Sequence, residues 1–478
     1  MDFSNRQNRF VQLHDAPSDY IKAIYESTQY DPFYPAYHIA PKHGLVNDPN
    51  GLYELNGEHH IFYQWFPLGP VHGLKHWYHV STKDFITYHD HGVALYPDQD
   101  YDEHGCFSGS TFVENNQASI FYTANKMVDG VAVQTQVLAS TDGNGVKKLG
   151  VIVNNQETHP THEFRDPIVY KKDNEYIMLV GAQNLNEEAA LELYRGPDFK
   201  QLKYCGNVSF SKKSVGFMLE CPNYYEEAGQ GVFVFSPQGL SSESKYDYKN
   251  VFSVVYAVGN EIDLDTLEFS HQGFVELDKG FDFYAPQIYQ DESGRRLMYG
   301  WLGNSKSVYP TDKNGWAHML TLPRELQVKD GIIYQSVIDE MNALKQEQLD
   351  VTSSMTLPSR QFKLELEVAK TFNISFENEQ GDSIVFSGTK DEFKLDRSKM
   401  THMYATDFGI ERFAKRRLGA QKIELWFDHS SLEIFCDNGA TVFTTRVFID
   451  ELSQLKVEGV VGTLHVLDAI KIPYKLVR

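Results

Sequence analysis

Three acidic residues stand in short motifs that recur along the first 340 residues of this 478-residue sequence. Asp48 lies in NDPNG, Asp166 in FRDP and Glu220 in ECP. Two carboxyl groups held close together can cleave a glycosidic bond, because one protonates the leaving oxygen while the other attacks the anomeric carbon or activates water. Crowded carboxylates also raise the pKa of one member, which suits it to donate a proton near neutral pH. The three acids predict hydrolase chemistry, provided that the fold brings them together.

The sequence surroundings of Glu220 and Asp48 favour different roles. Glu220 follows the apolar stretch VGFML and precedes Cys221-Pro222, so we expect desolvation to raise its pKa and make it the acid/base. Asp48 lies in a tight segment that would hold its side chain rigidly, as a nucleophile requires. Each acid also has a structural interpretation, as part of a turn, an ion pair or a strand edge. Three acids at one phase of a repeat favour catalysis over these alternatives.

Short apolar strands must position these acids, and they recur with steps of 56 to 64 residues. Several units continue with a second strand, an acidic turn and a third strand that ends in glycine. Four short strands at this period are typical of propeller blades, and we count five. The recurring strands are HIFYQWF (60–66), SIFYTA (119–124), EYIMLVGA (175–182), GVFVFSP (231–237) and RLMYGWLG (296–303).

The motifs occupy nearly the same phase of every predicted blade. They lie 11 to 14 residues before the middle of each recurring strand, at Asp48, Ser108, Asp166, Glu220 and Tyr284. If this phase is the innermost strand, five segments that are distant in sequence converge around one central channel.

The flanking segments predict the other elements. Residues 17–28 are expected to form a short helix, and residues 335–349 carry apolar side chains at helical spacing. Further on, apolar and polar residues alternate with period two, and Asn438-Gly439 predicts a hairpin turn, as in an antiparallel sandwich. Trp426 and Phe427 are interpreted as core residues. The prediction is an all-β protein with an N-terminal extension (1–33), a five-bladed β-propeller (34–335), a linker helix (336–350) and a C-terminal β-sandwich (351–478).

Composition excludes several classes of partner. The 44 Lys and Arg against 65 Asp and Glu give a net charge of −21, which argues against binding nucleic acid or an anionic membrane surface. The N-terminus has no secretory signal, and no apolar run approaches the roughly 18 residues that span a membrane. The four cysteines form no CxxC pair, and we expect free thiols and a cytoplasmic location.

One histidine group invites comparison with a metal site. His72, His76 and His79 lie close together in sequence, but on a strand His76 and His79 would point to opposite faces. We interpret them as surface histidines and expect neither a metal ion nor another cofactor.

The motifs NDPNG, FSGS (107–110), FRDP, ECP and FYAP (283–286), in this order, resemble those of glycoside hydrolase family 32, the invertase and fructosidase family. The resemblance extends from about Tyr34 to the C-terminus. It implies a five-bladed propeller followed by a sandwich, and retaining cleavage of terminal β-fructofuranosides. It further implies that Asp48 is the nucleophile, Glu220 the acid/base and Asp166 the stabiliser of the transition state. The substrate-binding set is expected to be Leu45, Val46, Asn47, Gln64, His72, Lys75, Phe107, Ser108, Arg165 and Tyr284.

The sequence departs from the family pattern at two places. Leu45-Val46 precede Asn47 where the family often has Trp-Met, and His72 stands where the family has a Trp at the rim of the site. The segment VHGLKHWYH (71–79) resembles the bacterial branch of the family that acts on sucrose 6-phosphate. Lys75 is then a candidate donor to the phosphate, and a solvated loop lysine is the alternative.

We therefore expect a β-fructofuranosidase whose partner is a small fructoside: sucrose 6-phosphate, sucrose or both. An intracellular fructosidase for short fructo-oligosaccharides is the nearest alternative. A transferase and a sugar-binding propeller without catalysis are further alternatives, and retention of all three acids speaks against the last. The sequence predicts no particular oligomeric state.

Overall fold

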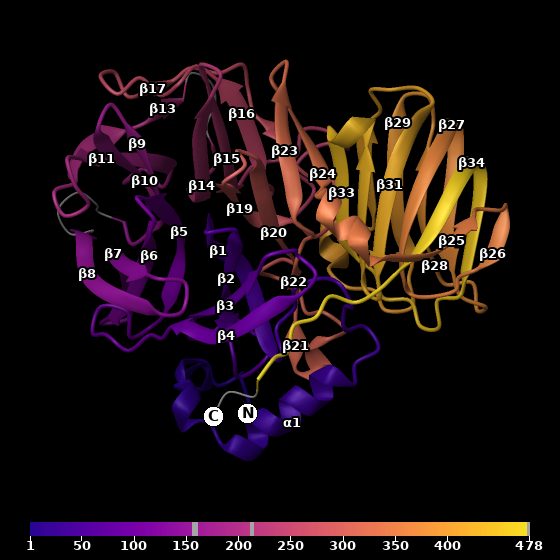
Figure 1. The fold of residues 1–478 in the computed structure, drawn as a ribbon, viewed down its shortest axis with the longest axis horizontal. Coiled ribbons are helices and arrows are strands. Elements are labelled where there is room, and N and C mark those ends of the chain that lie inside the picture. The colour runs from indigo at the N-terminus through magenta and orange to yellow at the C-terminus, as the bar shows by residue number, and fades with distance from the viewer. Residues whose placement is uncertain (155–160, 211–214, 476–478) are drawn as a thin grey trace.

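Five antiparallel blades of four main strands each form a propeller, with a short fifth strand in two of them, and a β-sandwich follows it in the chain (Figure 1). The computed structural model describes residues 1–154, 161–210 and 215–475. Each blade begins with its innermost strand: β1 (Gly44–Leu55), β5 (Cys106–Glu114), β9 (Phe164–Lys172), β14 (Met218–Glu227) and β19 (Tyr284–Gln290). These five strands contact one another in a closed ring, and β19 meets β1. The predicted propeller is confirmed, with the motifs on the innermost strands.

The remaining strands build the blades outward. Blade 1 adds β2 (Glu58–Phe66), β3 (His76–Thr82) and β4 (Tyr88–Leu95), and blade 2 adds β6 (Gln117–Val128), β7 (Val131–Thr141) and β8 (Val146–Asn154). Blade 3 adds β10 (Glu175–Gln183), β11 (Ala189–Gly196) and β12 (Lys203–Asn207), and blade 4 adds β15 (Gln230–Gln238), β16 (Val255–Gly259) and β18 (Val275–Glu276). Blade 5 adds β20 (Arg296–Leu302), β23 (Arg324–Lys329) and β24 (Ile332–Val337).

Short elements complete the propeller. β21 (Trp316–Ala317) runs parallel to β1, β22 (Met319–Leu320) pairs with β20, and β13 (Ser209–Phe210) pairs with β17 (Glu268–Phe269). The 3-10 helix η4 (Asp312–Asn314) precedes β21.

The N-terminal extension folds onto the propeller. It contains two 3-10 turns, η1 (Arg6–Phe10) and η2 (Leu13–Asp15), and the predicted helix, observed as α1 (Ser18–Gln29). The Tyr20 hydroxyl donates to the Leu68 carbonyl at 2.6 Å, and the Leu74 amide donates to the Arg9 carbonyl at 2.7 Å. The extension thereby braces the loop between β2 and β3.

The C-terminal domain is an antiparallel sandwich. It comprises β25 (Lys345–Asp350), β26 (Ser354–Thr356), β27 (Gln361–Glu377), β28 (Ser383–Gly388), β29 (Glu392–Lys399), β30 (Glu411–Lys415), β31 (Gln421–Asp428), β32 (Ser431–Cys436), β33 (Thr441–Arg446) and β34 (Gln454–Leu467). The 3-10 turns η6 (Thr406–Phe408) and η7 (Asp437–Gly439) lie in its loops. The predicted Asn438-Gly439 turn joins β32 to β33, with positive φ at both residues.

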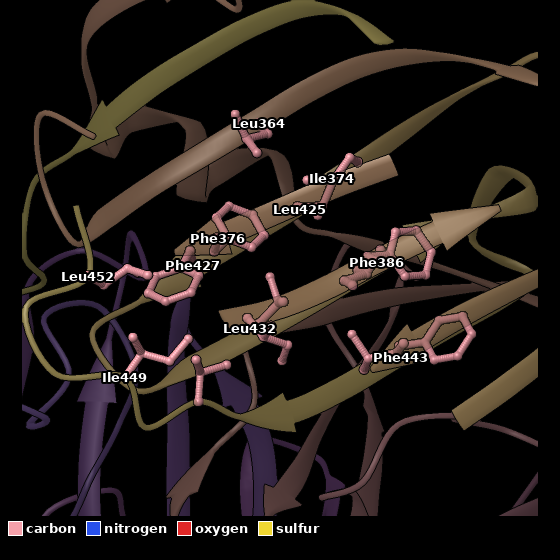
Figure 2. Packing of buried hydrophobic residues seen from close by; sticks show 14 of the residues in the cluster. Leu364, Ile374, Phe376, Phe386, Leu425, Phe427, Leu432, Phe443, Ile449 and Leu452 are labelled. Carbon is pink, nitrogen blue, oxygen red and sulfur yellow. The ribbon is translucent and has the colours of Figure 1, made fainter. Parts of the chain in front are cut away.

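Alternating apolar residues of the sandwich strands point into one core. Figure 2 shows Phe376, Phe427 and Leu432 among the side chains that fill it, and all three are fully buried. The Phe376 and Phe427 ring centroids lie 5.4 Å apart. Trp426 is 1% exposed, so its interpretation as a core residue is confirmed.

The linker differs from the prediction. Where we expected a helix over 336–350, the structure has a six-residue 3-10 helix, η5 (Asp339–Leu344), between β24 and β25. Both ends of the segment are extended strands instead of helix, because β24 pairs with β23 and β25 pairs with β34. Met341 and Leu344 are buried, and their i, i+3 spacing fits a 3-10 turn as well as an α-helix.

A buried charge network joins the propeller to the sandwich. Arg324 on β23 bonds Glu433 on β32 at 2.6 Å (Nη2 to Oε2), and Glu433 Oε1 lies 2.9 Å from His38 Nε2. His38 Nδ1 also lies 2.8 Å from Asp428 Oδ2. Burial opposes a charge on His38, but its contacts with Asp428 and Glu433 raise its pKa to about 9.

Two further observations bear on the expectations from sequence. His76 and His79 are 0% and 2% exposed, so their interpretation as surface histidines is wrong; strand β3 lies between two others and is covered on both faces. Among the described residues, no helix is long and apolar enough to cross a membrane.

Candidate active site

A β-bulge interrupts each of the five innermost strands where the sequence motif lies. The register shifts fall at 46–49 on β1, 106–109 on β5, 165–168 on β9, 220–223 on β14 and 284–287 on β19. Bulges next to active sites re-aim side chains. This shared break in pairing brings the motif side chains together around the central channel.

Asp48 is held by hydrogen bonds to both of its oxygens. Asn47 Nδ2 donates to Oδ1 at 3.0 Å, and the Ser108 hydroxyl donates to Oδ2. Burial raises the pKa of Asp48 and nearby Glu220 adds to the effect, whereas the bonds from Ser108 and Asn47 oppose it. A carboxylate fixed at both oxygens is suited to attack in one direction.

Asn47, Gln64 and Ser108 close a hydrogen-bonded ring with Asp48. Asn47 Nδ2 also donates to Gln64 Oε1 at 2.6 Å, and Gln64 Nε2 donates to Ser108 Oγ at 2.7 Å. Lys75 Nζ donates to Asn47 Oδ1 at 2.6 Å. Because a carboxylate can only accept, Asp48 takes Asn47 Nδ2 and the Ser108 hydroxyl as donors, and Asn47 turns its oxygen toward Lys75.

Glu220 has polar neighbours, unlike its apolar neighbours in sequence. Arg165 donates to Oε1 from Nε at 2.9 Å and from Nη2 at 2.8 Å. Tyr284 and Gln238 donate to Oε2 at 2.6 and 2.7 Å. The expectation that VGFML surrounds this carboxyl with apolar groups is corrected, because alternate residues of a strand face opposite sides. Gln238, on the neighbouring strand β15, was not predicted.

Asp166 lies beside Cys221 at the centre of the propeller. The Cys221 amide donates to Asp166 Oδ2 at 2.9 Å, and Cys221 Sγ lies 3.5 Å from the same oxygen. Burial raises the pKa of Asp166 to about 7; Arg165 opposes the shift, and the charges of Glu220 and Asp48 add to it. Both Asp166 and Cys221 adopt positive φ, 68° and 48°, a strained backbone of the kind found at functional sites. Sequence patterns predict no role for Cys221, although the ECP motif places it next to Glu220.

The structure therefore brings most of the predicted residues together. The exceptions in the substrate-binding set are Leu45 and Val46, which are 2% and 0% exposed and pack in the hydrophobic core beneath blade 1. We do not propose them as sugar contacts. Phe107 is partly exposed, and its carbonyl accepts a hydrogen bond from Trp77 Nε1 at 3.0 Å.

His72 and Lys75 both face the site. Lys75 Nζ lies 3.0 Å from His72 Nδ1, and the His72 ring packs edge-on against Trp301 at 5.7 Å between centroids. Burial lowers the pKa of Lys75 to about 7, although the charge of Asp48 opposes this. The pKa of His72 is lowered by burial and then by Lys75, His318, Arg9 and Lys306. Arg9 and Lys306 were not predicted, because they come from the N-terminal extension and from the loop after β20.

Three carboxylates converge here, with one fixed by an amide and a hydroxyl, one held by an arginine and a tyrosine, and one buried between them. A five-bladed propeller that carries this arrangement at the ends of its innermost strands defines a glycoside hydrolase.

Comparisons with known proteins agree that the chain is a glycoside hydrolase. Residues 38–337 match the family model "Glycosyl hydrolases family 32 N-terminal domain", and residues 327–468 match "Glycosyl hydrolases family 32 C terminal". The chain belongs to glycosyl hydrolases family 32.

Several relatives share one name. A sucrose-6-phosphate hydrolase from Vibrio alginolyticus is 46% identical over 467 residues, which cover 96% of each chain. One from Staphylococcus xylosus is 33% identical over 463 residues and 93% of each chain. The solved structure of sucrose-6-phosphate hydrolase from Lactobacillus gasseri matches with a TM-score of 0.92 and 29% identity, covering 98% of this chain and 100% of that one. A β-fructofuranosidase from Bombyx mori matches with a TM-score of 0.83 and 27% identity over 96% and 99%.

Proposed function

We propose that this protein hydrolyses sucrose 6-phosphate in preference to sucrose and releases fructose with retention of configuration. The observation that carries the proposal is the convergence of Asp48, Asp166 and Glu220 at one position of three blades. The similarity to sucrose-6-phosphate hydrolases over nearly the whole chain supports the choice of substrate.

In the first step Asp48 attacks the anomeric carbon of the fructosyl unit. The bond from carbon to the glycosidic oxygen breaks, and Glu220 gives its proton to that leaving oxygen. The hydrogen-bonded ring of Asn47, Gln64 and Ser108 holds the Asp48 carboxylate in place during the attack. The product of this step is a fructosyl ester on Asp48 and a free glucose 6-phosphate.

In the second step the ester is hydrolysed. Glu220, now ionised, takes a proton from water, whose oxygen attacks the anomeric carbon while the bond to Asp48 breaks. Fructose leaves, Asp48 regains its charge and Glu220 is protonated again. Tyr284, Gln238 and Arg165 all donate to Glu220, so they stabilise its ionised form between the two steps.

Asp166 is proposed to stabilise the transition state. Positive charge develops on the sugar ring as the glycosidic bond breaks, and a buried carboxylate that binds fructose hydroxyls opposes that charge strongly. The Cys221 amide, which donates to Asp166 at 2.9 Å, fixes its orientation.

The phosphate is proposed to bind near His72. Lys75 Nζ lies 3.0 Å from His72, and the Leu74 amide of the same segment donates to the Arg9 carbonyl at 2.7 Å. Lys306 also acts on His72, so this is a cationic part of a protein whose net charge is −21. Lys75 already donates to Asn47 and contacts His72. The exposed Lys306 is therefore the better candidate for a charge-assisted bond to phosphate.

Steady-state kinetics test the substrate preference. In the wild type we expect kcat/KM to be higher for sucrose 6-phosphate than for sucrose. Lys306→Ala should lower kcat/KM for the phosphorylated sugar by roughly 10-fold, the loss of one charge-assisted bond, and leave sucrose within about twofold. Lys313→Ala, an exposed lysine in the same segment, is the matched control. Equal kcat/KM on both sugars in the wild type would remove the phosphate proposal, and a higher value on short fructo-oligosaccharides would replace it.

We also propose a cytoplasmic location. All four cysteines are free, which is usual in a reducing compartment. A phosphorylated disaccharide is charged and does not diffuse across membranes, so its hydrolase belongs where the sugar phosphate is delivered. Fractionation of cells that produce the protein tests this.

A further inference from the structure

Blade 1 contains a cluster of histidines from three neighbouring strands, away from the three acids. His60 lies on β2, His79 on β3 and His91 on β4, and one ligand atom from each lies within 4.8 Å of the others. His60 and His79 are 5% and 2% exposed, and His91 is partly exposed. Their described hydrogen bonds run to one another and to Ser81, and not to the ring that holds Asp48.

A bulge in β4 directs His91 into the cluster. His79 pairs with Gly92 and Val80 with Asp90, so His91 is the additional residue between two pairs. An additional residue in a strand re-aims the side chain that it carries. The three imidazoles thereby meet although their residues are separated by 19 and 12 positions in the chain.

We propose that His60, His79 and His91 form a binding site for one borderline divalent metal ion such as Zn²⁺, outside the active site. Imidazole suits Zn²⁺, Ni²⁺ and Cu²⁺, whereas Mg²⁺ and Ca²⁺ prefer oxygen ligands. Three histidines and one water make a common four-coordinate zinc site.

Two of the three imidazoles are already placed for a shared ion, and the third ring must move to complete the site. Two nitrogens bound tetrahedrally to one zinc are about 3.3 Å apart, given zinc–nitrogen bonds of about 2.0–2.1 Å. His60 Nδ1 and His79 Nε2 are 3.0 Å apart. The His79 and His91 rings are stacked at 4.1 Å with 10° between their planes, so binding requires the partly exposed His91 ring to turn out of this stack.

A second layer of contacts sets the tautomer of His91 in the unbound protein. Ser81 Oγ donates its one proton to Glu58 Oε1 at 2.5 Å and lies 2.7 Å from His91 Nε2. Ser81 must therefore accept from His91 Nε2–H, which leaves the lone pair of Nδ1 free. A histidine whose second nitrogen is held through a carboxylate is typical of protein metal sites.

The imidazoles are neutral at neutral pH, as ligands must be. Burial lowers the pKa of His60 to about 4 and holds that of His79 well below its ordinary value. The pKa of His91 is lowered by burial and by the neighbouring His89. On binding, the hydrogen shared by His60 and His79 moves to an outer nitrogen, so no proton has to be released.

An ion can reach the cluster from solvent. A groove of about 650 Å³ between blades 1 and 2 is lined by His79 and His91, with Tyr96, Asn144 and Leu149 among its other walls. The groove also supplies the water for the fourth position. A bound ion would join the three outer strands of blade 1.

Metal titration tests the proposal. The protein is stripped with EDTA, dialysed and titrated with Zn²⁺ by calorimetry, and with Co²⁺ by visible absorption. We expect one equivalent of tight binding, a tetrahedral Co²⁺ spectrum and a higher Tm with Zn²⁺. His91→Gln should weaken binding by roughly 10-fold or more and abolish the Tm increase. His14→Gln, at an exposed histidine of the N-terminal extension, is the matched control and should bind as the wild type does.

The active-site acids and Cys221 offer a competing site, so the titration is repeated with Cys221→Ser, in which the tight equivalent should persist. Equal affinity in the wild type and His91→Gln would overturn the proposal, and so would a failure of the wild type to bind Zn²⁺ at 100 μM or below. Because His91 is partly exposed, its substitution is expected to leave the fold intact, which circular dichroism checks.

Discussion

Lys75 Nζ lies 2.6 Å from Asn47 Oδ1, while Nδ2 of the same amide lies 3.0 Å from Asp48 Oδ1. The lysine thus fixes which end of the Asn47 amide faces the nucleophile. Without it the amide could turn over and present an oxygen to Asp48, which would repel the carboxylate. Lys75 acts through Asn47 and is a positioning residue.

Lys75→Met should reduce kcat on sucrose by roughly 10- to 100-fold, because the nucleophile is no longer held in the productive orientation. KM should change less than kcat. Lys75→Arg supplies a permanently charged donor and should recover part of the loss, which a purely structural lysine would not require. If Lys75→Met raises KM for sucrose 6-phosphate alone and leaves kcat intact, the lysine binds phosphate instead.

The roles of Asp48 and Glu220 can be separated with an activated substrate. Asp48→Asn should abolish turnover of both sucrose and fructosyl fluoride, because neither can form the covalent ester. Glu220→Gln should lower sucrose turnover by roughly 10²- to 10⁴-fold, the usual size of general acid catalysis. Fluoride needs little protonation to leave, so Glu220→Gln should still form the ester from fructosyl fluoride, which mass spectrometry of the intact protein detects. An Asp48→Asn variant that hydrolyses either substrate would contradict the assignment.

Retention of configuration follows from the proposed double displacement. Reaction in the presence of methanol should give methyl β-fructofuranoside, since two inversions restore the original configuration. Proton NMR of the product distinguishes the two anomers. An α product would require direct attack by water and would exclude Asp48 as the nucleophile.

The propeller could be predicted because a motif precedes each recurring apolar strand by nearly the same number of residues. In the structure these motifs lie on the innermost strands β1, β5, β9, β14 and β19. The direction of the hydrogen bonds could not be predicted, since it depends on amide orientations. Sequence spacing pointed to the wrong group of histidines. His76 and His79 are neighbours in the chain, but the cluster takes His60 and His91 from adjacent strands through strand register.

The charge network between the domains predicts that removing the charge of Glu433 lowers the stability of the protein strongly. Glu433 accepts from Arg324 and contacts His38, and all three are buried. Glu433→Gln leaves two cationic groups with less compensation, so it should lower the free energy of unfolding by roughly 3 kcal/mol. Glu458→Gln, at an exposed position of β34, should cost under about 0.5 kcal/mol. Urea denaturation measures both, and equal values would show that the network contributes little.

Asp166 predicts a pH-dependent conflict between stability and activity. Its pKa is about 7 in the folded protein, raised by burial from an ordinary value of 3.8, so the folded state binds the proton more tightly than the unfolded state. The stability that this group contributes is full below about pH 4, and it is lost as the pH rises through about 7.

Asp166→Asn removes the ionisable group, so the variant should gain Tm over the wild type by about 2–4 °C at pH 8 and by less at pH 5. The same substitution should reduce kcat by at least about 10²-fold, because the charge opposed to the developing oxocarbenium ion is lost. Differential scanning calorimetry at the two pH values provides the measurement, with Asp173→Asn, in an exposed turn between β9 and β10, as the control. A Tm difference that is the same at both pH values would mean that Asp166 does not titrate in this range.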